Sequence, residues 1–216
     1  MILGLLTILI MLGVAYAFFR EGVLTAATTC VNVVIAGLVA FNFFEPLARE
    51  LEPLLTGSFL QGYEDSLCLM VLFGLTLGLL RLAVNNLSNV EPESTALLKQ
   101  GGAALFGLLT GYLASGFLVC VLQTLPWHEH FLGFDSAVDL KSPGEKARRF
   151  MPPDRVWLAL LQFGSRGGLG RGDEGIFDKN GTFELRYQRF RRSADNRDPL
   201  PDQGEAPARD PEGVPP

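Results

Sequence analysis

Four long apolar stretches occupy the first 125 residues of this chain and constrain its fold more than any other feature. They run over residues 2–19, 23–44, 66–84 and 101–125, and each has about the length of the ~20 helical residues that cross the hydrocarbon core of a bilayer. Lipid offers no hydrogen-bond partners, so a segment in it must be a helix or part of a closed barrel. None of the stretches alternates apolar and polar residues like a barrel strand. The sequence therefore predicts an all-α membrane protein with four transmembrane helices.

Charge is distributed unevenly between these stretches and the rest of the chain. Only four of the 18 Lys and Arg residues and eight of the 23 Asp and Glu residues precede Pro126. A polar tail of dense mixed charge thus follows an apolar bundle, and neither half has the character of a nucleic-acid binder. We expect a four-helix transmembrane domain over 1–125, a small extramembrane region over 126–192 and a disordered tail over 193–216, where Pro, Asp, Gly and Glu dominate.

The first stretch could also be interpreted as a cleaved secretory signal, because the Ala-Tyr-Ala sequence at 15–17 resembles a signal-peptidase site. A signal usually opens with Lys or Arg, whereas Met1 is followed here by Ile2 and Leu3. The stretch is also longer than the usual ~7–15-residue apolar core of a signal, and three more stretches follow it. A retained first transmembrane helix is the better interpretation.

Small and polar residues follow one face of each of the last three predicted helices. Residues at three- and four-residue spacing share a helix face, and glycines at that spacing let two backbones approach closely, which holds helices together in lipid. We therefore expect a compact bundle with the second and fourth helices in close contact. The predicted packing residues are Thr25, Thr29 and Asn32 in the second stretch, Gly74 and Gly78 in the third, with Arg81 and Asn85 continuing that stripe, and Gly107, Gly111 and Ser115 in the fourth.

Charged residues are absent from the middle of the four stretches. A transporter or pump usually keeps acidic or basic residues deep in the bilayer, where charge is costly. Here Arg20 and Arg81 lie near the ends of their stretches, where they can reach the headgroups. Asn32 and Gln123 are amides within the predicted spans, and neither makes an ion pathway by itself.

The order of short motifs along the apolar half is distinctive. The first stretch is closed by Arg-Glu-Gly-Val-Leu at 20–24, the second ends in Phe-Glu-Pro-Leu at 44–47, and the third ends in Arg-Leu-Ala-Val-Asn at 81–85. The fourth opens with Gly-Gly-Ala-Ala-Leu-Phe-Gly-Leu-Leu-Thr-Gly at 101–111, after Lys99 and Gln100. In these features the first 125 residues or so resemble the colicin V production protein (CvpA-type) family.

One departure from the family concerns the first loop. Family members often continue it with a second basic residue followed by an acid, where this chain has Thr25 and Ala26. Any role of that pair is therefore not carried over to this chain. The resemblance otherwise implies a four-helix integral protein of the bacterial cytoplasmic membrane, associated by family name with production or export of a peptide toxin and, more broadly, with envelope physiology. No biochemical activity comes with it.

Orientation follows from the same resemblance. Some relatives fuse the four-helix unit to a protease domain outside the cytoplasm, which implies that both termini of the unit lie outside. The loop charges agree, because Arg20, Arg81 and Lys99 then fall in cytoplasmic loops and Arg49 alone in the outer loop. A basic cluster at 141–149 favours the opposite orientation. It begins ~15 residues after the fourth stretch, however, which is near the largest distance at which loop charges influence orientation. We expect both termini outside.

The tail contains three patterns that predict local structure. Trp127 follows the fourth stretch directly, where an indole belongs in the headgroup belt. A Pro-Pro-Asp start at 152–154 and a stop at Gly164 enclose an apolar helix over 156–163, which we expect to dock on lipid or on a neighbouring hairpin. That β-hairpin is predicted over 177–187 by an Asn-Gly pair between two β-prone arms.

We find no pattern typical of a catalytic, cofactor or metal site. The His-Glu-His sequence at 128–130 could hold a metal ion but has no third ligand nearby, so an interfacial anchor is the preferred interpretation. The Gly-rich stretch 164–172 matches neither a Walker loop nor a dinucleotide fingerprint, which leaves a loop or a contact with anionic headgroups. Cys30, Cys68 and Cys120 are most simply small packing residues.

The sequence therefore favours a non-enzymatic membrane scaffold or accessory protein. The alternative is a subunit of a small oligomeric transporter or channel, whose pore would use faces such as Thr25, Thr29 and Asn32. A large water-lined cavity between the helices would favour transport, and close glycine-mediated packing would favour the scaffold. Expected partners are the lipid bilayer and other membrane proteins or a second copy of the chain, without nucleic acid.

Overall fold

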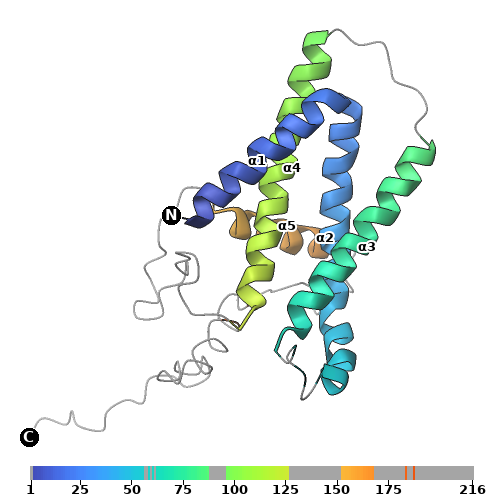
Figure 1. Cartoon of the computed structure of the whole chain (residues 1–216). Helices are drawn as coiled ribbons and strands as arrows, with labels where there is room; N and C mark the ends of the chain where they lie inside the picture. The colour runs from blue at the N-terminus through green and yellow to red at the C-terminus, as the bar shows by residue number, and fades with distance from the viewer. Residues whose placement is uncertain are drawn as a thin grey trace, which may run out of the picture.

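The computed structural model describes residues 2–55, 58, 60, 62–87, 96–126, 152–167, 183 and 187. This part of the chain contains five helices, namely α1 (Ile2–Glu21), α2 (Val23–Leu55), α3 (Glu64–Leu87), α4 (Ala96–Thr124) and α5 (Pro153–Gly167) (Figure 1). The first four are long and apolar enough to cross a membrane, since ~20 apolar residues suffice. The prediction of four long apolar helices is confirmed.

The spatial order of the four long helices differs from their order in the chain. Helix α1 packs mainly along α4, while α2 lies between α3 and α4 and contacts both extensively. Figure 1 shows α1 crossing α4 on one side of the bundle and α3 leaning against the other side. The helices are thus arranged as α1, α4, α2 and α3, and the predicted contact between the second and fourth helices is confirmed.

A single residue reverses the chain between α1 and α2. Gly22 has a φ of 105°, a conformation that costs glycine little because it has no Cβ. Its N–H donates to the carbonyl of Phe18 at 3.1 Å, and its own carbonyl accepts from the N–H of Ala26 at 3.1 Å. The turn keeps backbone groups paired at the edge of the membrane. We call this end of the bundle the Gly22 end, and the opposite end, where α4 finishes, the Thr124 end.

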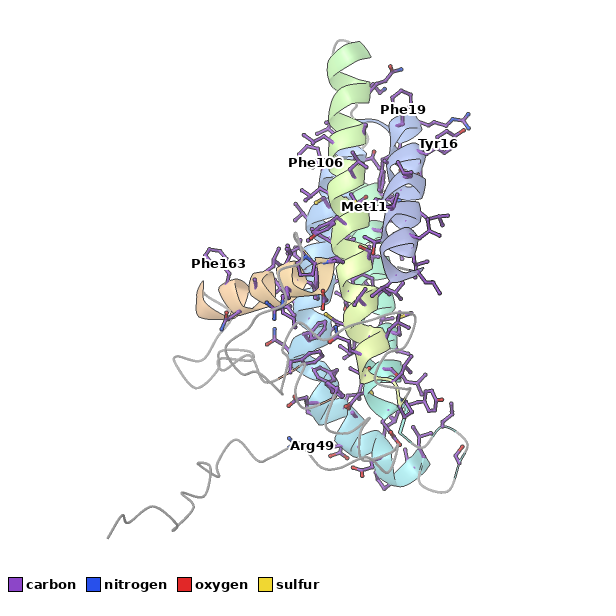
Figure 2. The ribbon with its side chains drawn as sticks, turned by 90° about the vertical axis from the view of Figure 1, so that its left-hand side faces the viewer. Met11, Tyr16, Phe19, Arg49, Phe106 and Phe163 are labelled. Atoms are coloured by element: carbon purple, nitrogen blue, oxygen red, sulfur yellow. The ribbon has the colours of Figure 1, made fainter. Side chains whose placement is uncertain are left out.

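Helix α2 continues past the predicted stop at Phe44 to Leu55 and contains Pro46 and Pro53. The whole helix is about 50 Å long at ~1.5 Å per residue, so it exceeds the ~30 Å hydrocarbon core by several turns. The added part carries the exposed Arg49 (Figure 2). Pro46 therefore ends the apolar span without ending the helix.

The core lies in the half of the bundle toward the Thr124 end, where aromatic rings from four helical segments meet. Phe117 of α4 stacks on Phe73 of α3 with ring centroids 4.0 Å apart. The same ring meets Phe41 of α2 and Trp157 of α5 edge-on, each at 5.9 Å. Such edge-to-face and offset pairs add to the stabilisation from burial. Phe117 of α4 therefore contacts an aromatic ring of each of α2, α3 and α5.

Helix α5 lies across the bundle rather than along it (Figures 1 and 2). The predicted helix over 156–163 is confirmed, and it is longer than expected because it continues past Gly164 to Gly167. Among the described residues it packs on α4 and, less extensively, on α2. Its protein partner is therefore the transmembrane bundle itself.

The predicted β-hairpin over 177–187 is described only at Phe183 and Tyr187, and both residues are helical. At these two positions the prediction of a strand is wrong. Both rings are buried, and their centroids lie 4.9 Å apart. The Tyr187 hydroxyl donates to the Asp65 carboxylate at 2.7 Å, which ties this segment to the start of α3. No β-hairpin is seen in the described part of the chain.

Candidate functional site

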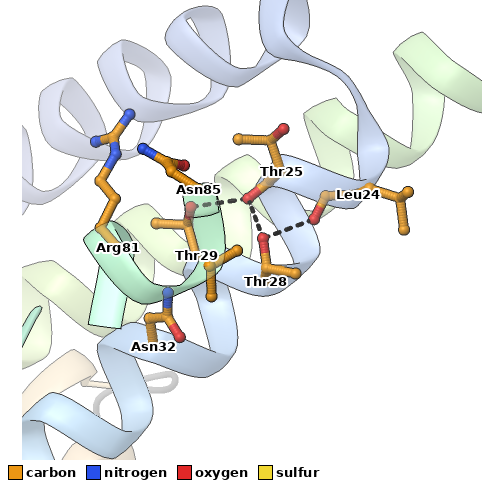
Figure 3. A pocket seen from close by; sticks show the side chains of 8 residues that line it. Leu24, Thr25, Thr28, Thr29, Asn32, Arg81 and Asn85 are labelled. Atoms are coloured by element: carbon orange, nitrogen blue, oxygen red, sulfur yellow. Dashed lines mark hydrogen bonds between the residues drawn. The ribbon is translucent and has the colours of Figure 1, made fainter. Parts of the chain in front are cut away.

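A polar pocket lies between α2 and α3 near the Gly22 end (Figure 3). Its volume is about 120 Å³. It brings together five of the residues named in the sequence analysis and has Thr28 as a further polar neighbour. The lining residues are Leu24, Thr25, Thr28, Thr29 and Asn32 from α2 and Arg81, Val84 and Asn85 from α3.

The threonines of the pocket are partly satisfied by their own helix. Thr28 donates its hydroxyl proton toward the carbonyls of Leu24 and Thr25, at 2.9 and 3.1 Å. Thr29 donates to the carbonyl of Thr25 at 2.7 Å. Such bonds to the preceding turn are how helices accommodate threonine in lipid. The hydroxyl protons of these two residues are therefore directed at the α2 backbone and not at the pocket.

The remaining polar side chains lie at two ends of the pocket. Figure 3 shows Arg81 and Asn85 together at one end, both from α3, and Asn32 at the other. Asn32 is only 6% exposed. Arg81 reaches the end of α1, where its Nη2 lies 3.8 Å from Oε1 of Glu21. Because both side chains of this ion pair are exposed, it is a weak contact.

The glycines predicted to pack α4 lie against α1. A Cβ on Gly107 would approach the Cα of Ala15 to 2.7 Å, and a Cβ on Gly111 would approach the Cα of Met11 to 2.7 Å. Both distances are shorter than real Cβ contacts, so these positions require glycine. These two glycines therefore bring α4 against α1 and not against α2, although α4 contacts α2 as well.

The glycines predicted to pack α3 lie elsewhere. Among the described residues no atom lies within 4 Å of a Cβ built on Gly74 or Gly78. Their neighbours Leu75 and Leu79 are both 60% exposed, so this face of α3 points away from the bundle. Ser115 of α4 is buried and donates to the carbonyl of Tyr112 in its own helix at 2.8 Å.

A second feature, a notch for α5, was not found from the sequence. A Cβ on Gly37 of α2 would overlap the indole of Trp157, and a Cβ on Gly116 of α4 would overlap the carbonyl of Pro153. Trp157 is fully buried there. Neither glycine belongs to a repeated spacing, and the partners are separated by many tens of residues, so no local pattern connects them.

A buried polar contact fixes the start of α5 beside this notch. The Nε2 of Gln123 donates to Oδ2 of Asp154 at 3.0 Å. Gln123 is fully buried and Asp154 is 5% exposed. A hydrogen bond to a buried carboxylate is among the stronger ones. Gln123, which the sequence marked only as an amide within a span, therefore positions the helix that follows the span.

No group of three or more His, Cys, Asp or Glu side chains that could hold a metal ion occurs within the described ranges. Cys30, Cys68 and Cys120 are free thiols, and all three belong to the main core cluster. Of the predicted interfacial residues, Arg20 is exposed at the end of α1. Trp127, the His-Glu-His sequence and the region 193–216 lie outside the described residues.

The model of one protein family, described as colicin V production protein, matches residues 3–134. The match covers more than half of the chain and includes all four long helices. No curated protein and no solved structure matches the chain.

Proposed function

This chain belongs to the colicin V production protein family, and we propose on that premise that it is a non-enzymatic scaffold or accessory protein. Family and helices together make it a multi-pass membrane protein. The finer proposal is that it resides in the bacterial inner membrane and serves toxin production or export, or envelope physiology, by holding other membrane components together.

The observation that supports a scaffold is the close packing of the helices inside the bundle. Glycines of α4 bring its backbone against α1, and an aromatic core joins α2, α3, α4 and α5. The polar pocket extends along α2 from Thr25 to Asn32, which is about 10 Å at ~1.5 Å per residue, against a hydrocarbon core of ~30 Å. In the described part of the chain the pocket thus covers about a third of a crossing.

The alternative function, a subunit of an oligomeric transporter or channel, is favoured by the polar lining of the same pocket. Polar side chains at membrane depth often mark substrate paths, and a second copy against α2 and α3 would be needed to extend this one across the bilayer. The two functions are separated by reconstituting the purified full chain in liposomes. A scaffold gives no ion or solute flux above empty liposomes, whereas flux that is lost in Asn32→Leu would establish transport.

The scaffold is tested in native membranes by photo-crosslinking from the exposed face of α3. We expect a probe at Leu75 or Leu79 to yield one defined adduct with a membrane protein or with a second copy. A probe at Leu5 of α1, which is 67% exposed, is the matched control and should give a different adduct or lipid only. Adducts with lipid alone at all three positions would contradict the proposal.

We further propose that both termini of the four-helix unit lie outside the cytoplasm. The first residues of α1 lie beside the last two turns of α4 on the side of the Thr124 end, since Leu3 and Leu122 both pack on Val119. Arg20, Arg81 and Lys99 belong to the opposite end, which the charge rule favours as cytoplasmic. An alkaline phosphatase fused after Leu140 should be active, and an inactive phosphatase with a fluorescent cytoplasmic-type reporter would reverse the orientation.

Helix α5 supplies the scaffold with an element that lies in the plane of the membrane. Its contacts with Gly37 and Gly116 place it about 12 Å before the end of α4 at ~1.5 Å per residue, which is within the apolar span on the side of the Thr124 end. Phe163 is 80% exposed and stands on the side of α5 that faces the Gly22 end (Figure 2). Apolar side chains of an in-plane helix reach ~5–10 Å into the acyl region, so we place Phe163 among lipid chains.

This placement is tested with Phe163→Trp in a Trp127→Phe background, because the remaining Trp157 is buried. Lipids brominated along their acyl chains should quench the new tryptophan in bilayers. Quenching by an aqueous quencher such as iodide, and not by brominated chains, would place α5 in water instead.

A further inference from the structure

The polar pocket opens at the depth at which lipid phosphates lie. Glu21 is the last residue of α1, and Arg81 lies beside it, so the α3 side of the pocket is at the membrane surface of the Gly22 end. Asn32 lies about 10 Å deeper along α2 at ~1.5 Å per residue. The pocket therefore leads from the headgroup layer into the upper hydrocarbon layer.

The free hydrogen-bonding capacity of the pocket consists mainly of donors. Thr28 and Thr29 spend their hydroxyl protons on carbonyls of α2, which leaves their oxygens as acceptors. Arg81 carries five N–H donors and no acceptor, and the amide groups of Asn32 and Asn85 each add two donors and one acceptor oxygen. Within the described residues Glu21, at 3.8 Å, is the charged group closest to the guanidinium. An excess of donors around one arginine suits a ligand that only accepts hydrogen bonds and carries negative charge.

The size of the pocket and the chemistry of its residues further limit which ligands it could bind. A volume of about 120 Å³ is well above the ~10–15 Å³ that one water molecule needs in a cavity, so a compact polar group has room in the pocket. A buried amide such as Asn32 is costly to leave without a partner in hydrocarbon. Arginine binds phosphate oxygens in a two-pronged geometry that few other side chains offer.

We propose that this pocket binds a phosphate group between Arg81, Asn85 and Asn32. The phosphate is carried either by a phospholipid of the leaflet at the Gly22 end or by free inorganic phosphate. The exposed guanidinium and Asn85 contact its oxygens at the mouth, and Asn32 donates to an acceptor deeper in the pocket, such as an ester carbonyl of the same lipid. The site goes beyond the proposed scaffold function and does not depend on it.

The test uses the purified full chain in detergent and native mass spectrometry, with phosphatidylglycerol, phosphatidylethanolamine and inorganic phosphate as separate probes. Wild type should retain one phospholipid, and Arg81→Gln should weaken its retention about tenfold, as expected for loss of a charged hydrogen bond. Asn85→Leu keeps the arginine and should weaken retention less. Arg49→Gln, which removes an equal charge from an exposed site at the other end, should leave retention unchanged.

The arms of the experiment separate the two sources of phosphate. Retention of lipid that inorganic phosphate does not displace supports the phospholipid, and displacement by phosphate, or binding of phosphate alone, supports the free anion. If Arg81→Gln does not fold, Asn85→Leu and Asn32→Leu carry the comparison. Equal lipid retention by wild type and by all pocket variants, or binding of none of the three probes, would overturn the proposal.

Discussion

Helices α3 and α4 carry the same pair of glycines at four-residue spacing, and the two pairs have opposite surroundings. Gly107 and Gly111 bring the α4 backbone against α1, while nothing in the described structure lies within 4 Å of a Cβ on Gly74 or Gly78. The spacing therefore shows where a close approach is possible and not whether it occurs. Helix α3 uses its other face against α2, where Leu69 is buried, and turns its glycines away from the bundle.

The largest expected effect tests this contrast directly. Gly107→Leu and Gly111→Leu should each destabilise the bundle by about 3 kcal/mol or more, at the upper end of what overpacking costs, because the atoms in the way belong to the α1 backbone and cannot rotate aside. Gly74→Leu and Gly78→Leu should change stability by no more than ~0.5 kcal/mol, as for exposed sites. Reversible unfolding in mixed micelles measures all four. Equal losses of stability from the two pairs of substitutions would contradict this contrast, because they would show that Gly74 and Gly78 are also in close contact with a partner.

A smaller effect is expected at the notch for α5. Gly37→Ala and Gly116→Ala each add one methyl group against Trp157 or Pro153, and we expect a loss of about 2 kcal/mol, within the range for overpacking. The loss should be local, with hydrogen exchange rising in α5 and not in α1. Gly74→Ala is the matched control on the open face. Unchanged protection of α5 in both notch variants would contradict the docking of Trp157.

The polar contact beside the notch should contribute less. Asp154→Ala removes the partner of Gln123, and hydrogen bonds between membrane helices contribute about 1–2 kcal/mol at most. Asp154→Asn can still accept from the amide and should lose less. Hydrogen exchange across the first turn of α5 measures both variants. If protection of this turn is unchanged in Asp154→Ala, the carboxylate does not hold it.

The smallest expected effect concerns the start of α3, which has no glycine contact with another helix in the described part of the chain. Tyr187→Phe removes the 2.7 Å bond to Asp65, and the loss should be about 0.5–1.5 kcal/mol, as for a typical hydrogen bond. Exchange should increase at the start of α3. The same substitution at the exposed Tyr16, which is 70% exposed, is the control and should have no effect on α3.

Much of the secondary structure could be predicted, and the errors have physical causes. The predicted spans agree with α1, α3 and α4 to within a few residues, because apolar length decides what can cross lipid. Helix α2 was predicted too short, since Pro46 marks the end of the apolar stretch but the helix accommodates it. At positions 183 and 187 a strand was predicted from a nearby Asn-Gly turn signal, which is a local pattern and does not record that both aromatic rings are buried in tertiary contacts.

The candidate site was predicted in its residues but not in its form. Thr25, Thr29 and Asn32 were expected to pack against a neighbouring helix, and Arg81 was expected at the membrane interface. Together with Asn85 they line a pocket. A stripe of polar residues is visible in the sequence because residues three and four apart share a face. Whether two such stripes pack together or leave a pocket between them depends on the distance between the two helices. That distance cannot be predicted from the residues of one stripe.

By itself the sequence determined which segments are apolar enough for lipid, namely four helices, and which segment is polar, namely the tail. It also determined the helix faces on which small or polar residues gather. These are local properties, since apolar length and helical period are read within a span. Only the tertiary structure decided that α4 meets α1 through Gly107 and Gly111, and that Trp157 enters the notch at Gly37 and Gly116. In lipid every apolar face is equally well solvated, so the choice of partner comes from close fit between surfaces far apart in the chain.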